Sequence, residues 1–185
     1  MTAIVGLLLA AGRSRRFGAD KRWHRLAEGT PMALAAARRL LAACPETVAV
    51  VRPDDTELVA LLTAAGLRCV PCAEADGGMG HSLAAGVAAS GDTAGWLVAL
   101  ADMPFIAPAS YLAVLETLAG GARIARPTFE GRPGHPVGFS AAYRDALLQL
   151  TGDEGGKAII AGDPGALRLC PVNDPGVLHD IDRPG

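Results

Sequence analysis

The sequence predicts an α/β protein whose central, mostly parallel sheet carries helices on both faces. Three runs, at residues 5–9, 48–51 and 97–100, are almost continuously apolar, which is typical of strands buried on both faces. Segments with the helical spacing of apolar residues lie between these runs. Strands that alternate with helices at this spacing form a parallel sheet joined by right-handed crossovers.

The ends of the predicted helices carry the usual boundary signals. A helix over 31–43 has Thr30 as its expected N-cap and Pro31 at its first position, and a helix over 54–65 ends at Gly66. We expect the later strands to form the far edge of the sheet and a wall for a substrate. The other predicted elements are helices over 81–89, 108–118 and 141–150 and strands over 123–126, 137–139, 167–172 and 177–182.

The chain of 185 residues has the size and composition of a single domain, residues 1–185, and no segment resembles a linker. Half of the residues are hydrophobic, 19% are charged and the net charge is −2, which argues against a disordered chain and against electrostatic binding to nucleic acid or an anionic membrane. No apolar run reaches the roughly 20 residues that cross a bilayer. With four cysteines and no secretory pattern, the sequence favours a cytoplasmic, reduced protein.

A loop rich in small and basic residues follows the first predicted strand. It begins Leu9-Ala10-Ala11-Gly12-Arg13 and ends at Lys21. Open α/β sheets bind ligands at the carboxyl ends of their strands. Small residues let backbone N–H groups approach a phosphate, while the arginine and the lysine add positive charge. The loop matches neither the dinucleotide fingerprint nor the Walker pattern, so it predicts a triphosphate site of another kind.

Lys21 stands out because the chain has 15 arginines and only two lysines. A compact, flexible ammonium suits a phosphate contact at the end of this loop, and a solvated surface lysine is the alternative interpretation. Asp102 follows the buried strand over 96–101 at the same edge of the sheet. A carboxylate there can hold Mg²⁺ against phosphate oxygens, although an aspartate after a strand is also a common turn residue.

Asp180 and Asp182 lie two residues apart near the end of the chain. On the predicted strand over 177–182 they share one face, and either can complete a metal site. A solvated chain end explains them about equally well. Lys157 follows Gly155 and Gly156, where it can meet an anionic substrate at a helix start, or simply lie on the surface.

Several motifs occur together in a characteristic order. Residues 9–21, the Gly-Met-Gly-His-Ser-Leu segment at 78–83 and the Ala-Asp-Met-Pro segment at 101–104 resemble the molybdenum cofactor nucleotidyltransferases, which carry a MobA-like NTP transferase domain. The cytidylyltransferase branch of that family fits best. Further matches lie at 131–137, 152–157 and 180–184, so the resemblance spans nearly the whole chain.

The resemblance implies a Rossmann-like nucleotidyltransferase domain and assigns roles to residues. By the resemblance Asp102 would hold Mg²⁺ and Lys21 would contact the phosphates of the nucleotide. We expect Arg13, Lys21 and Asp102 to be catalytic and Asp182 to be the second ligand of Mg²⁺. His81 stands where a small residue is common in the family. The nucleotide would contact Leu9, Ala10, Ala11, Gly12, Arg13, Lys21, Gly80, Ser82, Leu83 and Asp102, and the second substrate would contact Gly134, His135 and Pro136. From its position, we expect Lys157 to contact the second substrate as well.

The resemblance also implies a reaction, in which the phosphate of a pterin cofactor attacks the α-phosphorus of CTP and pyrophosphate leaves. Such chemistry needs alignment and charge neutralisation rather than a protein nucleophile. A molybdoenzyme or its chaperone would be a further partner. Use of GTP, transfer to a sugar phosphate or an isoprenoid phosphate, and a non-catalytic role as a cofactor carrier stay open.

Overall fold

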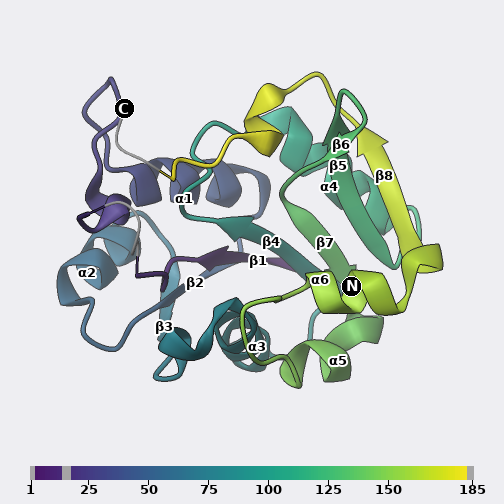
Figure 1. The fold of residues 1–185 in the computed structure, drawn as a ribbon, viewed down its shortest axis with the longest axis horizontal. Helices are drawn as coiled ribbons and strands as arrows, with labels where there is room; N and C mark the ends of the chain where they lie inside the picture. The colour runs from purple at the N-terminus through teal and green to yellow at the C-terminus, as the bar shows by residue number, and fades with distance from the viewer. Residues whose placement is uncertain (1–2, 14–17, 183–185) are drawn as a thin grey trace.

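The structure is a computed structural model that describes residues 3–13 and 18–182. Within these residues, eight strands form one mixed sheet in the order β3-β2-β1-β4-β7-β5-β6, and β8 pairs with β5 (Figure 1). The first four strands in the chain are parallel to one another. They are β1 (Ile4–Leu9), β2 (Thr47–Val51), β3 (Arg68–Pro71) and β4 (Gly95–Leu100).

The second half of the chain builds the other side of the sheet with reversed strands. β7 lies antiparallel between β4 and β5, β6 is antiparallel to β5, and β8 returns parallel to β5. The reversal places the start of β7 beside the carboxyl end of β4, which is where the site lies. These strands are β5 (Ile124–Phe129), β6 (Arg132–Pro133), β7 (Val137–Ser140) and β8 (Leu167–Pro171).

Helices cover both faces of the sheet, as Figure 1 shows. On one face lie α1 (Met32–Ala43), α2 (Thr56–Ala64) and α4 (Pro108–Ala119). On the other lie α3 (Met79–Ala89), α5 (Arg144–Leu148) and α6 (Lys157–Gly162). Short 3₁₀ turns are η1 (Lys21–Trp23), η2 (Ala75–Gly77), η3 (Ala141–Tyr143), η4 (Pro164–Ala166) and η5 (Pro175–Leu178).

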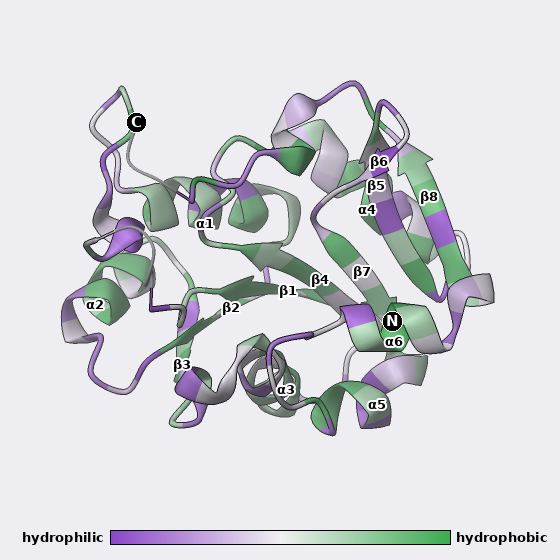
Figure 2. Ribbon diagram, in the orientation of Figure 1, coloured by the Kyte–Doolittle hydropathy of each residue, from purple (hydrophilic) through white to green (hydrophobic). Residues whose placement is uncertain are grey.

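Two apolar cores form because successive strand residues point to opposite faces of the sheet. In β1, Leu8 packs in the core with Leu40 of α1, whereas Leu7 packs in the other core with Val87 of α3. All four leucine and valine side chains are fully buried, and the central strands β1, β2 and β4 are mostly green, hence hydrophobic, in Figure 2. The doubly buried sheet is the fold class that the apolar runs predicted. No helix of the described chain is long and apolar enough to span a membrane.

Three details of the predicted elements are wrong. No strand covers 177–182, because Pro175 and an Asp174 side chain that accepts from Gly176 N turn this segment into η5, and irregular backbone follows. Thr30 is not the N-cap of α1, since the helix begins at Met32 with Pro31 in the cap position and no side-chain cap bond. The predicted helix over 141–150 divides into η3 and the short α5.

Candidate active site

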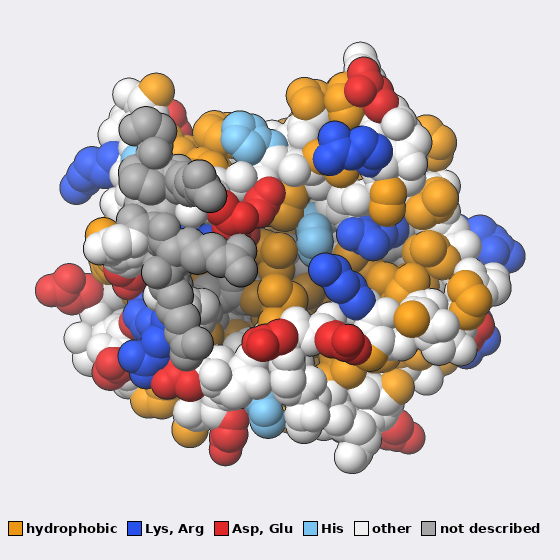
Figure 3. All heavy atoms as spheres, viewed as in Figure 1, with side chains coloured by type: hydrophobic (Ala, Val, Ile, Leu, Met, Phe, Trp, Pro, Cys, Tyr) orange, Lys and Arg blue, Asp and Glu red, His pale blue; other side chains and the backbone are white. Residues whose placement is uncertain are grey.

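A cavity of about 440 Å³ opens at the carboxyl edge of β1 and β4. In Figure 3 it belongs to the hollow at the centre of the molecule, where apolar side chains form the floor and acidic side chains stand at the rim. The edge of the sheet is where open α/β folds bind ligands. The residues that line the cavity are Leu9, Ala10, Ala11, Gly12, Arg13, Lys21, Arg22, Met32, Ala75, Asp76, Gly78, Met79, Ser82, Leu100, Ala101, Asp102, Asp153 and Asp182.

The charged centre of the cavity is formed by Lys21, Asp102 and Asp182. The ammonium of Lys21 donates to Asp102 Oδ2 at 2.7 Å and to Asp182 Oδ1 at 3.3 Å. Desolvation lowers the pKa of Lys21, but the hydrogen bonds and charges of Asp102 and then Asp182 outweigh it, and the pKa is raised overall. Lys21 is therefore a fixed cation, and the solvated-surface interpretation does not describe its surroundings.

The carboxylate oxygens of Asp102 and Asp182 are suited to bind a divalent cation. Asp102 Oδ1 is buried and has no hydrogen-bond partner within the described part of the chain. Among the described residues, no group of three or more His, Cys, Asp or Glu side chains is placed to hold a metal. Mg²⁺ is usually bound by one or two carboxylates, with substrate phosphates and water completing its coordination. The two aspartates match that pattern.

Asp182 reaches the cavity from irregular backbone rather than from a strand. Ile181 N donates to Asp102 O at 3.0 Å, which ties this segment to the end of β4. Asp180 is outside the cavity lining. Desolvation, followed by a hydrogen bond with Asp182, raises the pKa of Asp180. Of the two acids that the sequence left open, only Asp182 borders the cavity.

Arg22 ties together the two ends of the loop that follows β1. Its guanidinium donates to the Ala10 carbonyl at 2.7 Å and makes two contacts each with Asp20 and Asp55 at 2.5–2.8 Å. A guanidinium has five N–H donors, so these five contacts use its full capacity. The side chain is 4% exposed. Desolvation lowers the pKa of Arg22, but the hydrogen bonds and charges of Asp20 and Asp55 outweigh it, and the pKa is raised overall. Arg52 also contacts Asp55, at 3.2 Å.

Arg13 pairs with Asp76 of η2, through Nε and Nη2, across the mouth of the cavity. The pair joins the loop after β1 to the segment before α3. Ser14 to Phe17, which belong to the predicted loop, lie outside the described residues, as do Arg183 and Pro184.

The glycine-rich turn before α3 lines the cavity through Gly78 and packs closely against a second loop at 151–153. Gly78 has φ +121°, and a Cβ there would lie 2.3 Å from Gly152. Gly80 N donates to Gly152 O at 2.8 Å, and a Cβ on Gly80 would meet Thr151. The close approach brings Asp153 into the cavity wall. Both glycines are therefore needed for this loop to pack on α3.

The predicted residues of the second substrate lie beside the cavity, not in it. Gly134, His135 and Pro136 precede β7, and His135 N donates to Val177 O at 2.9 Å. A Cβ on Gly134 would lie 2.1 Å from Val177 O, so the approach of η5 requires glycine here. Lys157 begins α6 and is exposed, so it lies both at a helix start and on the surface, and contact with a substrate stays a prediction.

His135 lies in a locally positive field. Burial first, and then the charges of Arg126 and Lys157, lower the pKa of His135 from 6.5 to about 4. The imidazole is consequently neutral at pH 7. No carboxylate contributes to this shift, so the environment of His135 differs from the acidic centre around Asp102.

The structure brings together nine of the predicted site residues and separates the others. Leu83 is 2% exposed in the core, and His81 does not line the cavity. Sequence reasoning missed Arg22, Asp76 and Asp153, although Asp153 belongs to one of the matched motifs and Arg22 directly follows Lys21. The cavity contains Leu9, Ala10, Ala11, Gly12, Arg13, Lys21, Ser82, Asp102 and Asp182, but not Gly80, Leu83, Gly134, His135, Pro136 or Lys157.

Comparison with known proteins agrees with this fold. The Purine catabolism protein PucB of Bacillus subtilis (strain 168) is 30% identical, and the match covers 98% of this chain and 92% of the relative. The Nicotine blue oxidoreductase of Paenarthrobacter nicotinovorans is 27% identical over 98% of this chain and 93% of the relative.

Solved structures with the same fold include Rv0371c from Mycobacterium tuberculosis H37Rv, with a TM-score of 0.81, 25% identity and coverage of 98% of this chain and 94% of that one. A structure of Rv0371c in complex with manganese has a TM-score of 0.78 and 22% identity, covering 92% and 88% of the two chains.

The fold and the cavity define a nucleotidyltransferase domain. The family model of the MobA-like NTP transferase domain matches residues 6–168, and the chain belongs to that family. The resemblance in the sequence motifs is confirmed at this level. The relatives do not single out the cytidylyltransferase branch, which stays a prediction.

Proposed function

We propose that this nucleotidyltransferase moves CMP from CTP to the phosphate of molybdopterin and releases pyrophosphate. The observation that carries the proposal is the cavity in which the small residues Ala10 to Gly12 face Lys21 and Asp102 at one edge of the sheet. Small residues leave room for a phosphate chain close to the backbone, and the charged pair lies where that chain would end. Relatives of the MobA-like NTP transferase domain family support the reaction class.

The protein's own contribution is alignment and charge neutralisation. Arg13 and Lys21 border the cavity from the loop after β1, whereas the neighbouring Arg22 uses its N–H donors within the protein. They would hold the triphosphate in place and stabilise the negative charge that grows on the leaving pyrophosphate. Because two anionic reactants must approach, fixed cations reduce their repulsion before the bond forms.

Asp102 and Asp182 are the residues that would hold Mg²⁺. The buried, unpartnered Asp102 Oδ1 is the atom that most directly fits a cation, and the manganese complex of Rv0371c shows that a protein of this fold takes a divalent metal. The cation would neutralise phosphate oxygens of the nucleotide. Lys21 stands between the two carboxylates and would turn toward the phosphates when the nucleotide binds.

The decisive experiment measures pyrophosphate release with each of the four nucleoside triphosphates, with and without molybdopterin and Mg²⁺. We expect release with CTP only when both are present, and formation of a cytidylylated pterin by mass spectrometry. Release with GTP alone would assign the guanylyl reaction, and release only with a sugar phosphate or an isoprenoid phosphate would assign a different acceptor. Tight binding of molybdopterin without release would favour a cofactor carrier.

The relative named as an oxidoreductase calls for one further control. Reduced nicotinamide nucleotides are incubated with the protein under the same conditions and followed by absorbance. We expect no oxidation that depends on the protein, because the loop after β1 lacks the dinucleotide fingerprint.

A further inference from the structure

The edge of the sheet continues beyond the cavity toward the segment that precedes β7. β7 runs antiparallel to β4, with Val137 paired to Val98. Residues that precede Val137 therefore lie toward the carboxyl end of β4, where Leu100 lines the cavity. His135 is the first titratable side chain in that direction.

Arg126 lies on the next strand, β5, with its side chain partly buried. Its Nε donates to the Gly134 carbonyl at 2.7 Å, which fixes the guanidinium against the segment that carries His135. Within the described residues Arg126 forms no ion pair with a carboxylate, and desolvation alone lowers its pKa. Arg126 is thus a half-buried cation whose charge no carboxylate of the described residues neutralises, which leaves it able to pair with an anion.

Lys157 supplies a second positive charge as an exposed residue at the start of α6, a helix that packs on one face of the sheet. It forms no ion pair among the described residues, and its charge reaches His135 together with that of Arg126. The three side chains thus come from β5, the approach to β7 and the start of α6. Blue and pale-blue side chains gather beside the central hollow in Figure 3.

We propose that Arg126, His135 and Lys157 form a binding site for a phosphate monoester on the acceptor, adjacent to the nucleotide cavity. The planar guanidinium matches phosphate oxygens in pairs, and the ammonium adds a point charge. The neutral imidazole donates one N–H without requiring its own counter-ion. The proposal rests on the proposed function and adds Arg126, which no motif singled out, as a residue that determines acceptor choice.

The probe is inorganic phosphate, added to protein already saturated with Mg²⁺ and a non-hydrolysable CTP analogue so that the nucleotide loop is occupied. Calorimetry measures the phosphate affinity, and NMR follows the ring protons of His135. We expect Arg126→Gln and Lys157→Gln each to weaken phosphate binding at least about tenfold, as loss of a charge-assisted hydrogen bond does. Affinity for the CTP analogue should stay unchanged.

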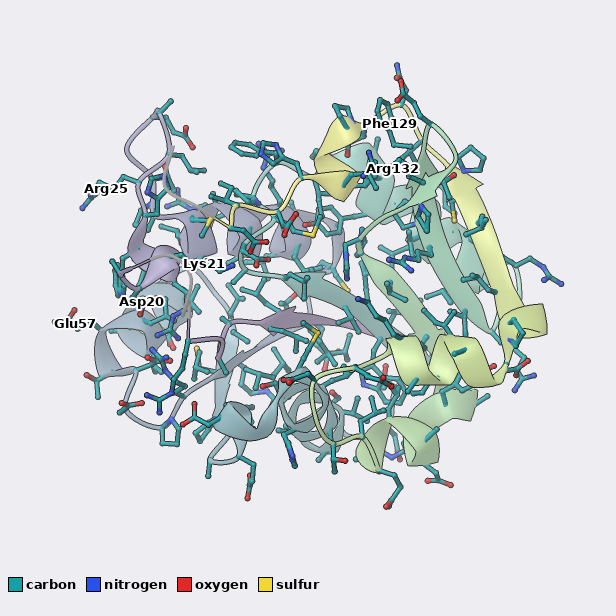
Figure 4. All side chains as sticks on the ribbon, viewed as in Figure 1. Asp20, Lys21, Arg25, Glu57, Phe129 and Arg132 are labelled. Atoms are coloured by element: carbon teal, nitrogen blue, oxygen red, sulfur yellow. The ribbon has the colours of Figure 1, made fainter. Side chains whose placement is uncertain are left out.

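Arg132→Gln is the matched control, because Arg132 is an exposed arginine on the neighbouring β5–β6 hairpin, labelled in Figure 4. Its phosphate affinity should equal that of the wild type. Circular dichroism confirms that each variant is folded, and Lys157→Gln tests the site independently if Arg126→Gln is unstable. The proposal is overturned if phosphate affinity is unchanged in folded Arg126→Gln and Lys157→Gln. It is also overturned if the His135 resonances do not move when phosphate is added.

Acetate titrated in the same way separates phosphate from carboxylate recognition. Acetate binding in place of phosphate overturns the phosphate assignment. Failure of the proposed function can be distinguished from failure of the phosphate site. If the protein releases no pyrophosphate from any nucleotide but binds phosphate in a way that depends on Arg126, the proposed reaction is wrong and the phosphate site stands. If folded Arg126→Gln releases pyrophosphate at the wild-type rate when the acceptor is limiting, the phosphate site is wrong and the proposed reaction stands.

Discussion

Lys21 Nζ lies 2.7 Å from Asp102 Oδ2 and 3.3 Å from Asp182 Oδ1, so one ammonium bridges both candidate metal ligands. Figure 4 shows Lys21 beside Asp20 at the inner side of the first loop. The ammonium holds the two carboxylates together, and a divalent cation that binds them must compete with it. Metal binding and nucleotide binding are therefore expected to be linked, because phosphates give Lys21 another partner.

Lys21→Met should increase the affinity of the nucleotide-free protein for Mn²⁺ by about tenfold, because a competing positive charge is removed. Electron paramagnetic resonance of free Mn²⁺ measures this directly. Lys157→Met, the corresponding change at the only other lysine, should leave the affinity as in the wild type. Equal or weaker Mn²⁺ binding by Lys21→Met would show that the lysine does not compete with the metal.

Asp102→Asn should lower kcat for pyrophosphate release at least about 100-fold, a loss comparable to removing one preorganised electrostatic group. The asparagine keeps the size of the side chain but loses the charge that would hold Mg²⁺. Steady-state kinetics at saturating Mg²⁺ check the prediction, with exposed Asp92→Asn as the control. Activity near that of the wild type would remove Asp102 from the mechanism.

Arg22→Lys should destabilise the protein by about 2–4 kcal/mol, since a lysine cannot replace five contacts to Ala10, Asp20 and Asp55. Urea unfolding measures the free energy. Because Arg22 positions the loop without touching the reacting atoms, KM for the nucleotide should rise more than kcat falls. A large fall in kcat with unchanged KM contradicts a positioning role.

The lowered pKa of His135, about 4 against 6.5, makes stability depend on pH. Between these values the unfolded chain binds the proton more readily than the folded protein, so stability is lost as the pH falls from about 6.5 toward 4. His135→Asn removes this group, and its free energy of unfolding should fall less over that range. Parallel profiles for wild type and variant, measured by urea unfolding at each pH, would show that His135 titrates normally.

Ala11 borders the cavity and is 3% exposed, so its methyl group takes up space next to the bound nucleotide. We expect kcat/KM for CTP to exceed that for GTP by at least about tenfold, because crowding by one methyl group costs a purine about 1–3 kcal/mol. Ala11→Gly should move this ratio toward GTP. Competition assays with both nucleotides test it, and a wild type that prefers GTP would refute this explanation of base choice.

Much of the fold could be predicted from the sequence because local patterns determine it. Apolar runs such as 48–51 form strands buried on both faces wherever they lie in the chain, and Gly66 ends its helix by local backbone freedom. Lys21 and Asp102 could be placed at one edge of the sheet because parallel strands share their carboxyl ends. The sequence by itself therefore determined the α/β class and the region of the cavity.

Only the tertiary structure decided which distant side chains meet. Asp182 contacts Lys21 although the strand expected for it is absent, and Asp55 reaches Arg22 from the loop after another strand. The reversed β7 brings His135 toward the end of β4, where no local pattern would place it. These contacts depend on the order and direction of strands in the sheet, which arise from burying both faces of the whole sheet at once rather than from any one segment.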